Sequence, residues 1–177
     1  MDCNPELIAA AQNNTAKLGF SDRFVLHTGE LADTRFLENL RMEASPVQLV
    51  MANPPWRLVG SGRLPTTEAR RKALFGDKGT FPLFASAASS LLEEDGRFAC
   101  IISPDRLQDM LAALDGAGLT PYLLQYIHKQ KTSPATFVLI EARKGAHAKP
   151  SVAEPIALYG PERFFTLESL AFCPFLR

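Results

Sequence analysis

The sequence predicts an α/β fold with a doubly wound, mainly parallel sheet of about six strands. Apolar runs of strand length alternate along the chain with segments in which hydrophobic residues recur at helical spacing. The clearest strands, Val47–Ala52 and Phe98–Ile102, are nearly continuous apolar runs, as strands buried on both faces are. The 177 residues, 46% of them hydrophobic, suffice for one domain with a sizeable core, which we expect to span residues 1–177.

The first predicted helix follows directly on the amino terminus. Asn4 suits the N-cap, Pro5 suits the first helical position, and Gly19 suits the helix end. Arg23–His27 then predicts a short strand, and a second helix is expected at about residues 33–43. Between them lies a Gly29-Glu30 loop, which by itself is a weak functional signal.

The strand Val47–Ala52 ends at Asn53-Pro54-Pro55-Trp56, which we call the Asn-Pro-Pro-Trp motif. The prolines stop the strand because they donate no hydrogen bond to a neighbouring strand. In an open α/β sheet, the carboxyl edge at which such a strand ends is where ligands bind. The purely structural alternative is a strand end followed by a polyproline turn with a packed tryptophan.

Residues 57–80 predict a mobile basic loop beside this edge, because glycines and Pro65 recur in it. Residues 57–78 hold six basic and two acidic side chains, a net charge of +4, although the whole chain has a net charge of zero. The six are Arg57, Arg63, Arg70, Arg71, Lys72 and Lys78. Contact with nucleic-acid phosphates is a natural use for such a cluster, and a solvated surface loop is the alternative.

The rest of the chain continues the alternation. Helices are predicted at Phe81–Leu92, from Pro104 onward after the cap residue Ser103, and near Thr166–Phe172, and strands at Leu119–His128, Thr136–Ala142 and Ile156–Tyr159. The connection between Leu119–His128 and Thr136–Ala142 is compatible with an antiparallel pair. We expect Thr136–Ala142 to lie antiparallel near the edge of the sheet.

The composition indicates the cellular location of the protein and argues against disulfides and a metal site. No apolar stretch approaches the ~20 residues that span a bilayer, and no signal-peptide pattern opens the chain, so a cytoplasmic protein is expected. Cys3, Cys100 and Cys173 are odd in number and widely spaced, which argues against a disulfide framework. The three histidines have no metal-ligand spacing, and no metal site is predicted.

The Asn-Pro-Pro-Trp motif resembles motif IV of amino-methyltransferases that use S-adenosylmethionine (SAM). The order of elements resembles the bacterial adenine-N6 methyltransferases of the valine tRNA anticodon loop, the "methyltransferase small" group. Softer similarities are Glu68-Ala69-Arg70, the turn from Leu91 to Phe98, and Ile156 to Tyr159. The resemblance covers essentially all 177 residues. It implies a Rossmann-like class I methyltransferase fold that methylates adenine N6 in RNA, with tRNA as the expected partner.

The resemblance also implies residue roles. Asn53 and Pro54 would activate the amine, and Pro55 and Trp56 would complete the catalytic motif, with Trp56 stacking on the flipped base. The implied cofactor-binding residues are Asp2, Cys3, Glu30, Leu31 and Asn53. The implied substrate-binding residues are Arg57, Arg70, Arg71 and Lys72.

One departure from the family is large. The first strand and glycine-rich loop, which hold the methionine end of SAM, are absent from these 177 residues. We therefore expect a sheet shortened at its N-terminal side and a chain that alone binds SAM poorly. A monomer is expected, with association through the incomplete sheet as an alternative. Two other functions stay open: methylation of a protein glutamine amide, as in release-factor methyltransferases with Asn-Pro-Pro-Tyr, and a non-catalytic binding domain.

Overall fold

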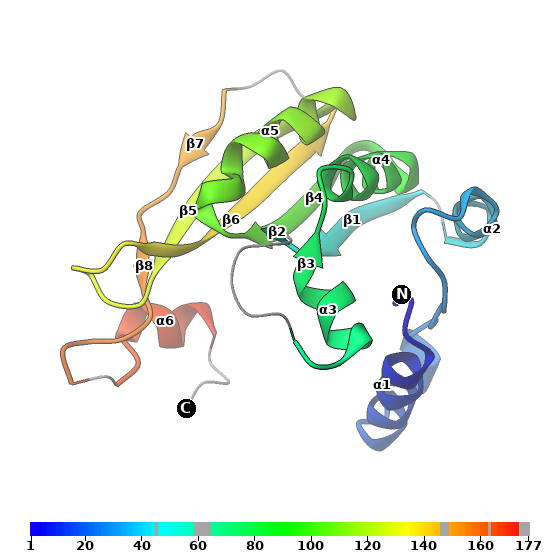
Figure 1. Ribbon diagram of the computed structural model, residues 1–177, viewed down its shortest axis with the longest axis horizontal. Coiled ribbons are helices and arrows are strands. Elements are labelled where there is room, and N and C mark those ends of the chain that lie inside the picture. Colours follow the sequence, from blue (N-terminus) through cyan, green and yellow to red (C-terminus); the bar gives the residue numbers. More distant parts are fainter. Residues whose placement is uncertain (45, 59–64, 146–148, 163, 174–177) are drawn as a thin grey trace. The chain divides into compact units, whose positions relative to one another are not determined.

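A computed structural model describes residues 1–44, 46–58, 65–145, 149–162 and 164–173 (Figure 1). The chain divides into two compact units, Met1–Ala44 and Ser45–Arg177. The single domain expected over residues 1–177 stays a prediction. Over the described ranges, no helix combines the length and the apolar character that crossing a membrane requires.

The first unit contains the helices α1 (Pro5–Lys17) and α2 (Thr34–Ala44) and the short 3-10 helix η1 (Ser21–Arg23). α1 begins as predicted, because the Asn4 side chain accepts a hydrogen bond from the backbone N–H of Glu6 at 2.9 Å. α2 begins after Asp33, whose carboxylate accepts hydrogen bonds from the backbone N–H groups of Arg35 and Phe36. Both helices therefore start at residues whose side chains cap them.

The strand predicted at Arg23–His27 is wrong. Arg23 ends η1, and Phe24 and Val25 are 54% and 79% exposed. Residues 24–27 form no bridge, and a single parallel bridge, between Thr28 and Asp2, follows directly after them. A strand needs a neighbour along its whole length, and among the described residues of this unit only Asp2 lies alongside in that way.

The second unit is built on a mixed six-stranded sheet. Its order is β1 (Val47–Ala52), β4 (Leu92–Ile102), β6 (Ala135–Lys144), β5 (Leu119–His128) and β7 (Ser151–Val152), and β8 (Ile156–Ala157) also pairs with β5. β1 is parallel to β4, and β7 and β8 are parallel to β5, whereas β6 is antiparallel to both β4 and β5. The prediction of a mainly parallel sheet with one long antiparallel strand is confirmed.

The predicted place of that antiparallel strand at the sheet edge is wrong. β6 lies between β4 and β5. The short connection after β5 lets β6 fold back along it, and β6 then pairs with β4 on its other side. Val138, Ile140 and Ala142 of β6 are accordingly buried.

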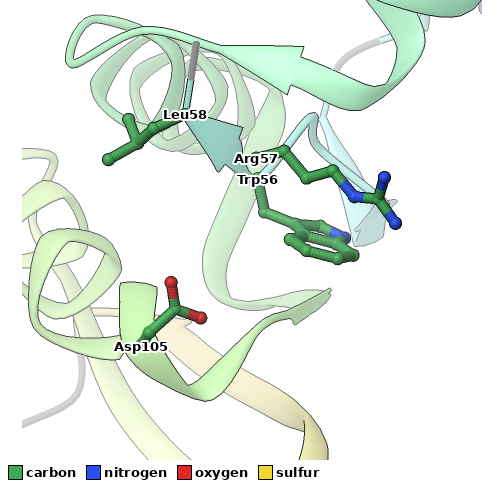
Figure 2. Close-up of a pocket in the computed structure, with 4 residues that line it drawn as sticks. All are labelled: Trp56, Arg57, Leu58 and Asp105. Atoms are coloured by element: carbon green, nitrogen blue, oxygen red, sulfur yellow. The ribbon is translucent and has the colours of Figure 1, made fainter. Parts of the chain in front are cut away.

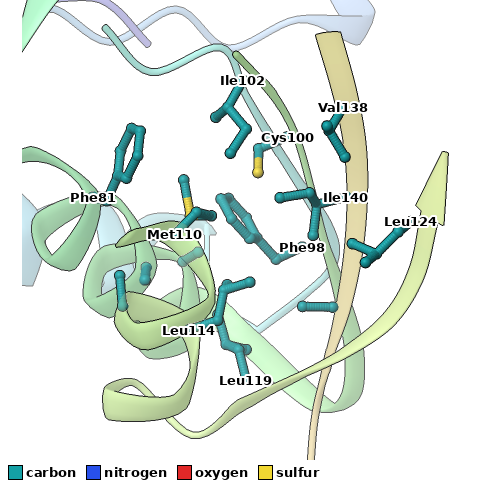
Figure 3. Packing of buried hydrophobic residues seen from close by; sticks show 14 of the residues in the cluster. Phe81, Phe98, Cys100, Ile102, Met110, Leu114, Leu119, Leu124, Val138 and Ile140 are labelled. Carbon is teal, nitrogen blue, oxygen red and sulfur yellow. The ribbon is translucent and has the colours of Figure 1, made fainter. Parts of the chain in front are cut away.

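Helices α4 (Thr80–Leu91) and α5 (Leu107–Gly116) pack against each other and against one face of the sheet (Figure 1). η2 (Pro104–Arg106) precedes α5, and α6 (Leu167–Phe172) contacts β8 near the chain end. Figure 3 shows the core that the two long helices form with the sheet. Its largest members include Phe81, Phe98, Met110, Leu114 and Ile140.

β1 has the predicted bounds, but its expected burial on both faces is wrong. β1 is the first strand in the sheet order, and its ladder partner is β4. Val50 and Ala52 pack against the core, whereas Leu49 and Met51 are 42% and 76% exposed. The apolar sequence of β1 therefore does not show that both faces of the strand are buried.

The mobile loop predicted over residues 57–80 is in part ordered structure. β2 (Arg57–Leu58) pairs in parallel with β3 (Phe75–Gly76), and α3 (Glu68–Leu74) precedes β3 directly. Phe75 and Gly76 are buried, so part of this segment belongs to the packed unit and not to a mobile cover. Residues 59–64, with Arg63, lie outside the described residues.

Candidate active site

The Asn-Pro-Pro-Trp motif follows the carboxyl end of β1, next to the carboxyl end of β4. Ala52 is paired with Cys100 in the parallel register, so the chain after each strand leaves the sheet at the same edge. Ligand sites of open α/β sheets form at such edges. The motif of β1 therefore stands beside η2, which follows β4.

Two acceptors of the motif have no hydrogen-bond partner among the described residues. Asn53 is exposed, and Pro54 is buried. Within the described part of the chain, no hydrogen bond engages the Asn53 side chain or the Pro54 carbonyl oxygen. The Asn53 oxygen can therefore accept a hydrogen bond from a ligand at the surface, whereas the Pro54 carbonyl is unpaired in a residue that is less than 2% exposed.

The carbonyls of Pro55 and Trp56 are in contact with neighbouring segments. A Cβ built on Gly76 would lie 2.6 Å from the Pro55 carbonyl oxygen, so the backbone of β3 packs directly against the motif. The Trp56 carbonyl accepts a hydrogen bond of 2.8 Å from Nη1 of Arg106. Neighbouring segments thus support the backbone at the two residues that follow Asn53 and Pro54.

The Trp56 ring is half-buried, and other side chains hold it. Its ring meets the Phe137 ring edge to face, with centroids 6.1 Å apart and an interplanar angle of 75°. The Arg57 guanidinium lies 5.2 Å from the centroid of the Trp56 ring (Figure 2). One face of the indole thus carries a cation.

A cavity of about 280 Å³ opens between Trp56, Arg57, Leu58 and Asp105. Figure 2 shows the Asp105 carboxylate pointing toward the side of the cavity on which Trp56 and Leu58 lie. The Ser103 hydroxyl donates a hydrogen bond to that carboxylate. The volume is near the lower end of the ~300–1,000 Å³ range of ligand pockets, which suits a single flat ring system.

Arg106 is the buried cation of this region, with its side chain 4% exposed. Besides the Trp56 carbonyl, its Nε donates to Oδ2 of Asp109 at 2.7 Å. Its Cζ lies 4.5 Å from the centroid of the Phe81 ring. A guanidinium withdrawn from water needs such partners, and here one of them is the backbone of the motif.

The residues predicted to bind the cofactor fall in both units. Asp2, Cys3, Glu30 and Leu31 belong to the first unit, and Asn53 belongs to the second. In the first unit, the Gly29 N–H donates to the Asp2 carbonyl at 3.1 Å, which brings the two predicted segments side by side.

One oxygen of the Asp2 carboxylate already accepts a hydrogen bond. Its Oδ1 accepts a hydrogen bond of 2.8 Å from the backbone N–H of Asn4, at the start of α1. A carboxylate has two oxygens, so one is left to accept a hydrogen bond from a hydroxyl group. The side chain can thus support the helix start and still accept a hydrogen bond from a ligand.

The predicted substrate-binding residues lie on two elements, Arg57 on β2 and Arg70, Arg71 and Lys72 on the exposed helix α3. Arg71 forms an ion pair of 2.7 Å with Glu68, and this hydrogen bond lowers the pKa of the Glu68 carboxyl. Arg70 has no ion-pair partner among the described residues. The three cations of α3 are therefore not equivalent.

The sequence reasoning missed Asp105, Arg106 and Gly76. It assigned Ser103 and Pro104 only to a helix start, although their position after an apolar parallel strand places them at the same sheet edge as the motif. That shared edge was the signal for Asp105 and Arg106. The packing of Gly76 on Pro55 has no local signal in the sequence.

No protein-family model matches the chain. Two curated relatives, from the Porphyromonas gingivalis strains W83 and ATCC 33277, are 32% identical to it over 112 residues. Each is described as a tRNA1(Val) (adenine(37)-N6)-methyltransferase. The match covers 62% of this chain, and the chain spans 42% of the length of these relatives.

Solved structures show the fold. A predicted O-methyltransferase from Agrobacterium tumefaciens superposes with a TM-score of 0.72 at 18% identity, over 98% of this chain and 73% of that one. An O-methyltransferase family 2 protein from Planctomyces limnophilus superposes with a TM-score of 0.51 at 17% identity, over 81% of this chain and 41% of that one. The chain therefore has a Rossmann-like class I methyltransferase fold, and in sequence it resembles the tRNA adenine-N6 methyltransferases.

Proposed function

We propose that the protein carrying this chain transfers a methyl group from SAM to the N6 amine of an adenine in RNA, with a tRNA as substrate. Two acceptors without a partner among the described residues carry this proposal, the exposed Asn53 side chain and the buried Pro54 carbonyl, which precede Trp56 at the end of β1. The names of the curated relatives support the same reaction.

The two acceptors would make the adenine amine a better nucleophile. The exocyclic amine of adenine is a poor nucleophile because its lone pair is delocalised into the ring. Hydrogen bonds from its two N–H groups to Asn53 and Pro54 would favour tetrahedral geometry at nitrogen and release the lone pair for attack. SAM, when bound, supplies a methyl group on a positively charged sulfur. This chain would therefore catalyse the reaction by positioning the amine and by presenting oriented dipoles to it, without a strong base.

The base itself would be held by Trp56. Stacking of a nucleobase on an aromatic side chain contributes about 1–3 kcal/mol. The adjoining cavity has the volume for a flat ring, and the Phe137 ring packs against the indole in a T-shaped arrangement. Arg57 lies over the indole, so a base would stack on the other face or take the place of the guanidinium.

The first unit supplies side chains that fit part of the cofactor. The uncommitted oxygen of Asp2 can accept a hydrogen bond from a ribose hydroxyl, with Cys3 as its exposed neighbour. Glu30 and Leu31, which follow Gly29, would contact the adenine ring of the cofactor. These roles rest on the resemblance and on the side-by-side placement of the two segments.

RNA would be bound through its phosphates by Arg57 and by the cations of α3. Single-stranded RNA binding of this kind is electrostatic and weakens as salt is added. Arg70 is best placed for it, because Glu68 already balances the charge of Arg71.

The test is to incubate the purified protein that carries this chain with SAM bearing a tritiated methyl group and an unmodified tRNA mixture. Nuclease digestion and chromatography then identify the labelled nucleoside, and the Asn53→Ala variant is the matched control. We expect label in N6-methyladenosine with the wild type and little with the variant. Label on a protein glutamine amide, or none in RNA, would overturn the proposal.

A further inference from the structure

We infer that Arg106 is a positioning residue that holds the Asn-Pro-Pro-Trp motif in place through the Trp56 carbonyl. This inference rests on the proposed function for its effect on the rate, and on geometry alone for its effect on Trp56. It assigns a role to η2, the second element at this sheet edge, for which sequence reasoning offered only the start of a helix.

The geometry separates a positioning role from simple charge balance. Arg106 and Trp56 are 50 residues apart in sequence, and their 2.8 Å hydrogen bond joins the ends of two parallel strands. Asp109, three residues along the same helical segment, already balances the charge at 2.7 Å. The bond to Trp56 adds nothing to that balance, and its consequence is to fix the backbone two residues after Pro54.

The planar guanidinium makes this arrangement possible. Its Nη1 reaches the Trp56 carbonyl while its Nε reaches Asp109, and its Cζ lies 4.5 Å from the centroid of the Phe81 ring. A lysine ammonium is a point charge without this fork and cannot reproduce the three contacts together. Since the carbonyl of Pro54 must point at the substrate amine, a small shift of the motif matters. Displacements of about 1 Å at reacting groups can lower rates about 10²-fold.

Trp56 provides a direct readout, because it is the single tryptophan in the sequence. Its fluorescence anisotropy and its quenching by acrylamide report the mobility and exposure of the motif without any turnover. The test variant is Arg106→Lys, which keeps the charge. The matched control is Arg143→Lys on β6, whose guanidinium lies 3.8 Å from the Tyr122 ring centroid and 3.6 Å from a Glu141 carboxylate oxygen.

We expect Arg106→Lys to raise the acrylamide quenching constant of Trp56 about twofold and to lower kcat about 10²-fold, with KM for SAM unchanged. Arg143→Lys should behave like the wild type in both measurements. Wild-type quenching of Trp56 in Arg106→Lys, or an equal change in Arg143→Lys, would overturn the inference. If the wild-type protein methylates no RNA, the proposed function fails and the Trp56 measurement still decides the role of Arg106.

A measurement on the wild type covers the case in which Arg106→Lys does not fold. A guanidinium held by two hydrogen bonds gives resolved, slowly exchanging Nε–H and Nη–H signals in nitrogen-15 NMR spectra. We expect such signals for Arg106, with a nuclear Overhauser effect to the Trp56 backbone. A rapidly averaged guanidinium signal, like that of an exposed arginine, would contradict the inference.

Discussion

Gly76→Ala is the substitution that tests the packing of the motif most simply. The new Cβ would lie 2.6 Å from the Pro55 carbonyl oxygen and 2.6 Å from Oγ1 of Thr80, whereas ordinary van der Waals contact begins at 3.4 Å. The backbone of Gly76 does not have a positive φ, so alanine brings no conformational strain of its own. The whole effect comes from the collision.

The structure sets the size of the effect. Moving the Thr80 hydroxyl away would break its hydrogen bonds with Asp77, and the Pro55 carbonyl belongs to the motif backbone, so one of the two must move by several tenths of an ångström. Overpacking of this kind typically costs about 1–3 kcal/mol of unfolding free energy. Because Pro55 follows the proposed acceptor Pro54, we also expect methyl transfer to slow by about 10- to 100-fold.

Urea unfolding followed by far-UV circular dichroism measures the free energy, and Trp56 emission reports the motif. The matched control is Gly116→Ala at the end of α5, where a Cβ meets nothing within 4 Å. That substitution should leave the unfolding free energy unchanged or raise it by up to about 1 kcal/mol. A Gly76→Ala protein as stable as Gly116→Ala, with wild-type Trp56 emission, would refute the packing account.

Three further predictions concern the acceptor, the cations and the buried thiol. Asn53→Ala should lower the single-turnover methylation rate by about 10²-fold or more with little change in SAM affinity, and a near wild-type rate would exclude its role. Arg70→Gln should reduce the slope of log binding constant against log salt for RNA by about 0.7, and Arg71→Gln by less, because Glu68 pairs with it. Equal slopes for the wild type, Arg70→Gln and Arg71→Gln would mean that α3 is a solvated surface helix that does not contact RNA. Burial raises the pKa of Cys100 from its ordinary 9.0 to about 12, so the unfolded chain loses this proton first and stability falls as pH rises between those values. Relative to Cys100→Ala, urea unfolding of the wild type should lose up to about 1.4 kcal/mol per pH unit there, and parallel pH profiles would contradict this.

The elements that the sequence predicted well are set by local chemistry. Asn4 and Pro5 define the start of α1 because a cap side chain and a missing N–H act within one turn. Pro54 and Pro55 define the end of β1 for an equally local reason, and its bounds were predicted to the residue.

The arrangement of the sheet depends on distant partners and was predicted less well. The apolar pattern of Val47–Ala52 could not predict that Met51 would be exposed, because hydrophobicity does not show which faces of a strand are covered by other elements. Arg23–His27 has the residues of a strand, but the single bridge of this region forms at Thr28, directly after it. β6 has the predicted direction, and its place beside β4 follows from pairing that no local pattern encodes.

The candidate site shows the same division. The Asn-Pro-Pro-Trp motif could be found because its four residues are adjacent. Arg106 and Gly76 act on the motif through contacts between segments far apart in the chain, and arginine and glycine are common in any sequence. Such supporting residues become visible only when the strand ends are seen side by side.

The most direct test of the central claim is the position of the methyl group on the RNA. Two stem-loops that differ at one unpaired position, adenine in one and purine without the N6 amine in the other, are incubated with the protein and SAM carrying a carbon-13 methyl group. Mass spectrometry of the digested RNA then locates the label. We predict N6-methyladenosine in the first RNA and no label in the second. Methylation of the purine RNA, or of a ring nitrogen of the adenine, would show that Asn53 and Pro54 do not activate an exocyclic amine.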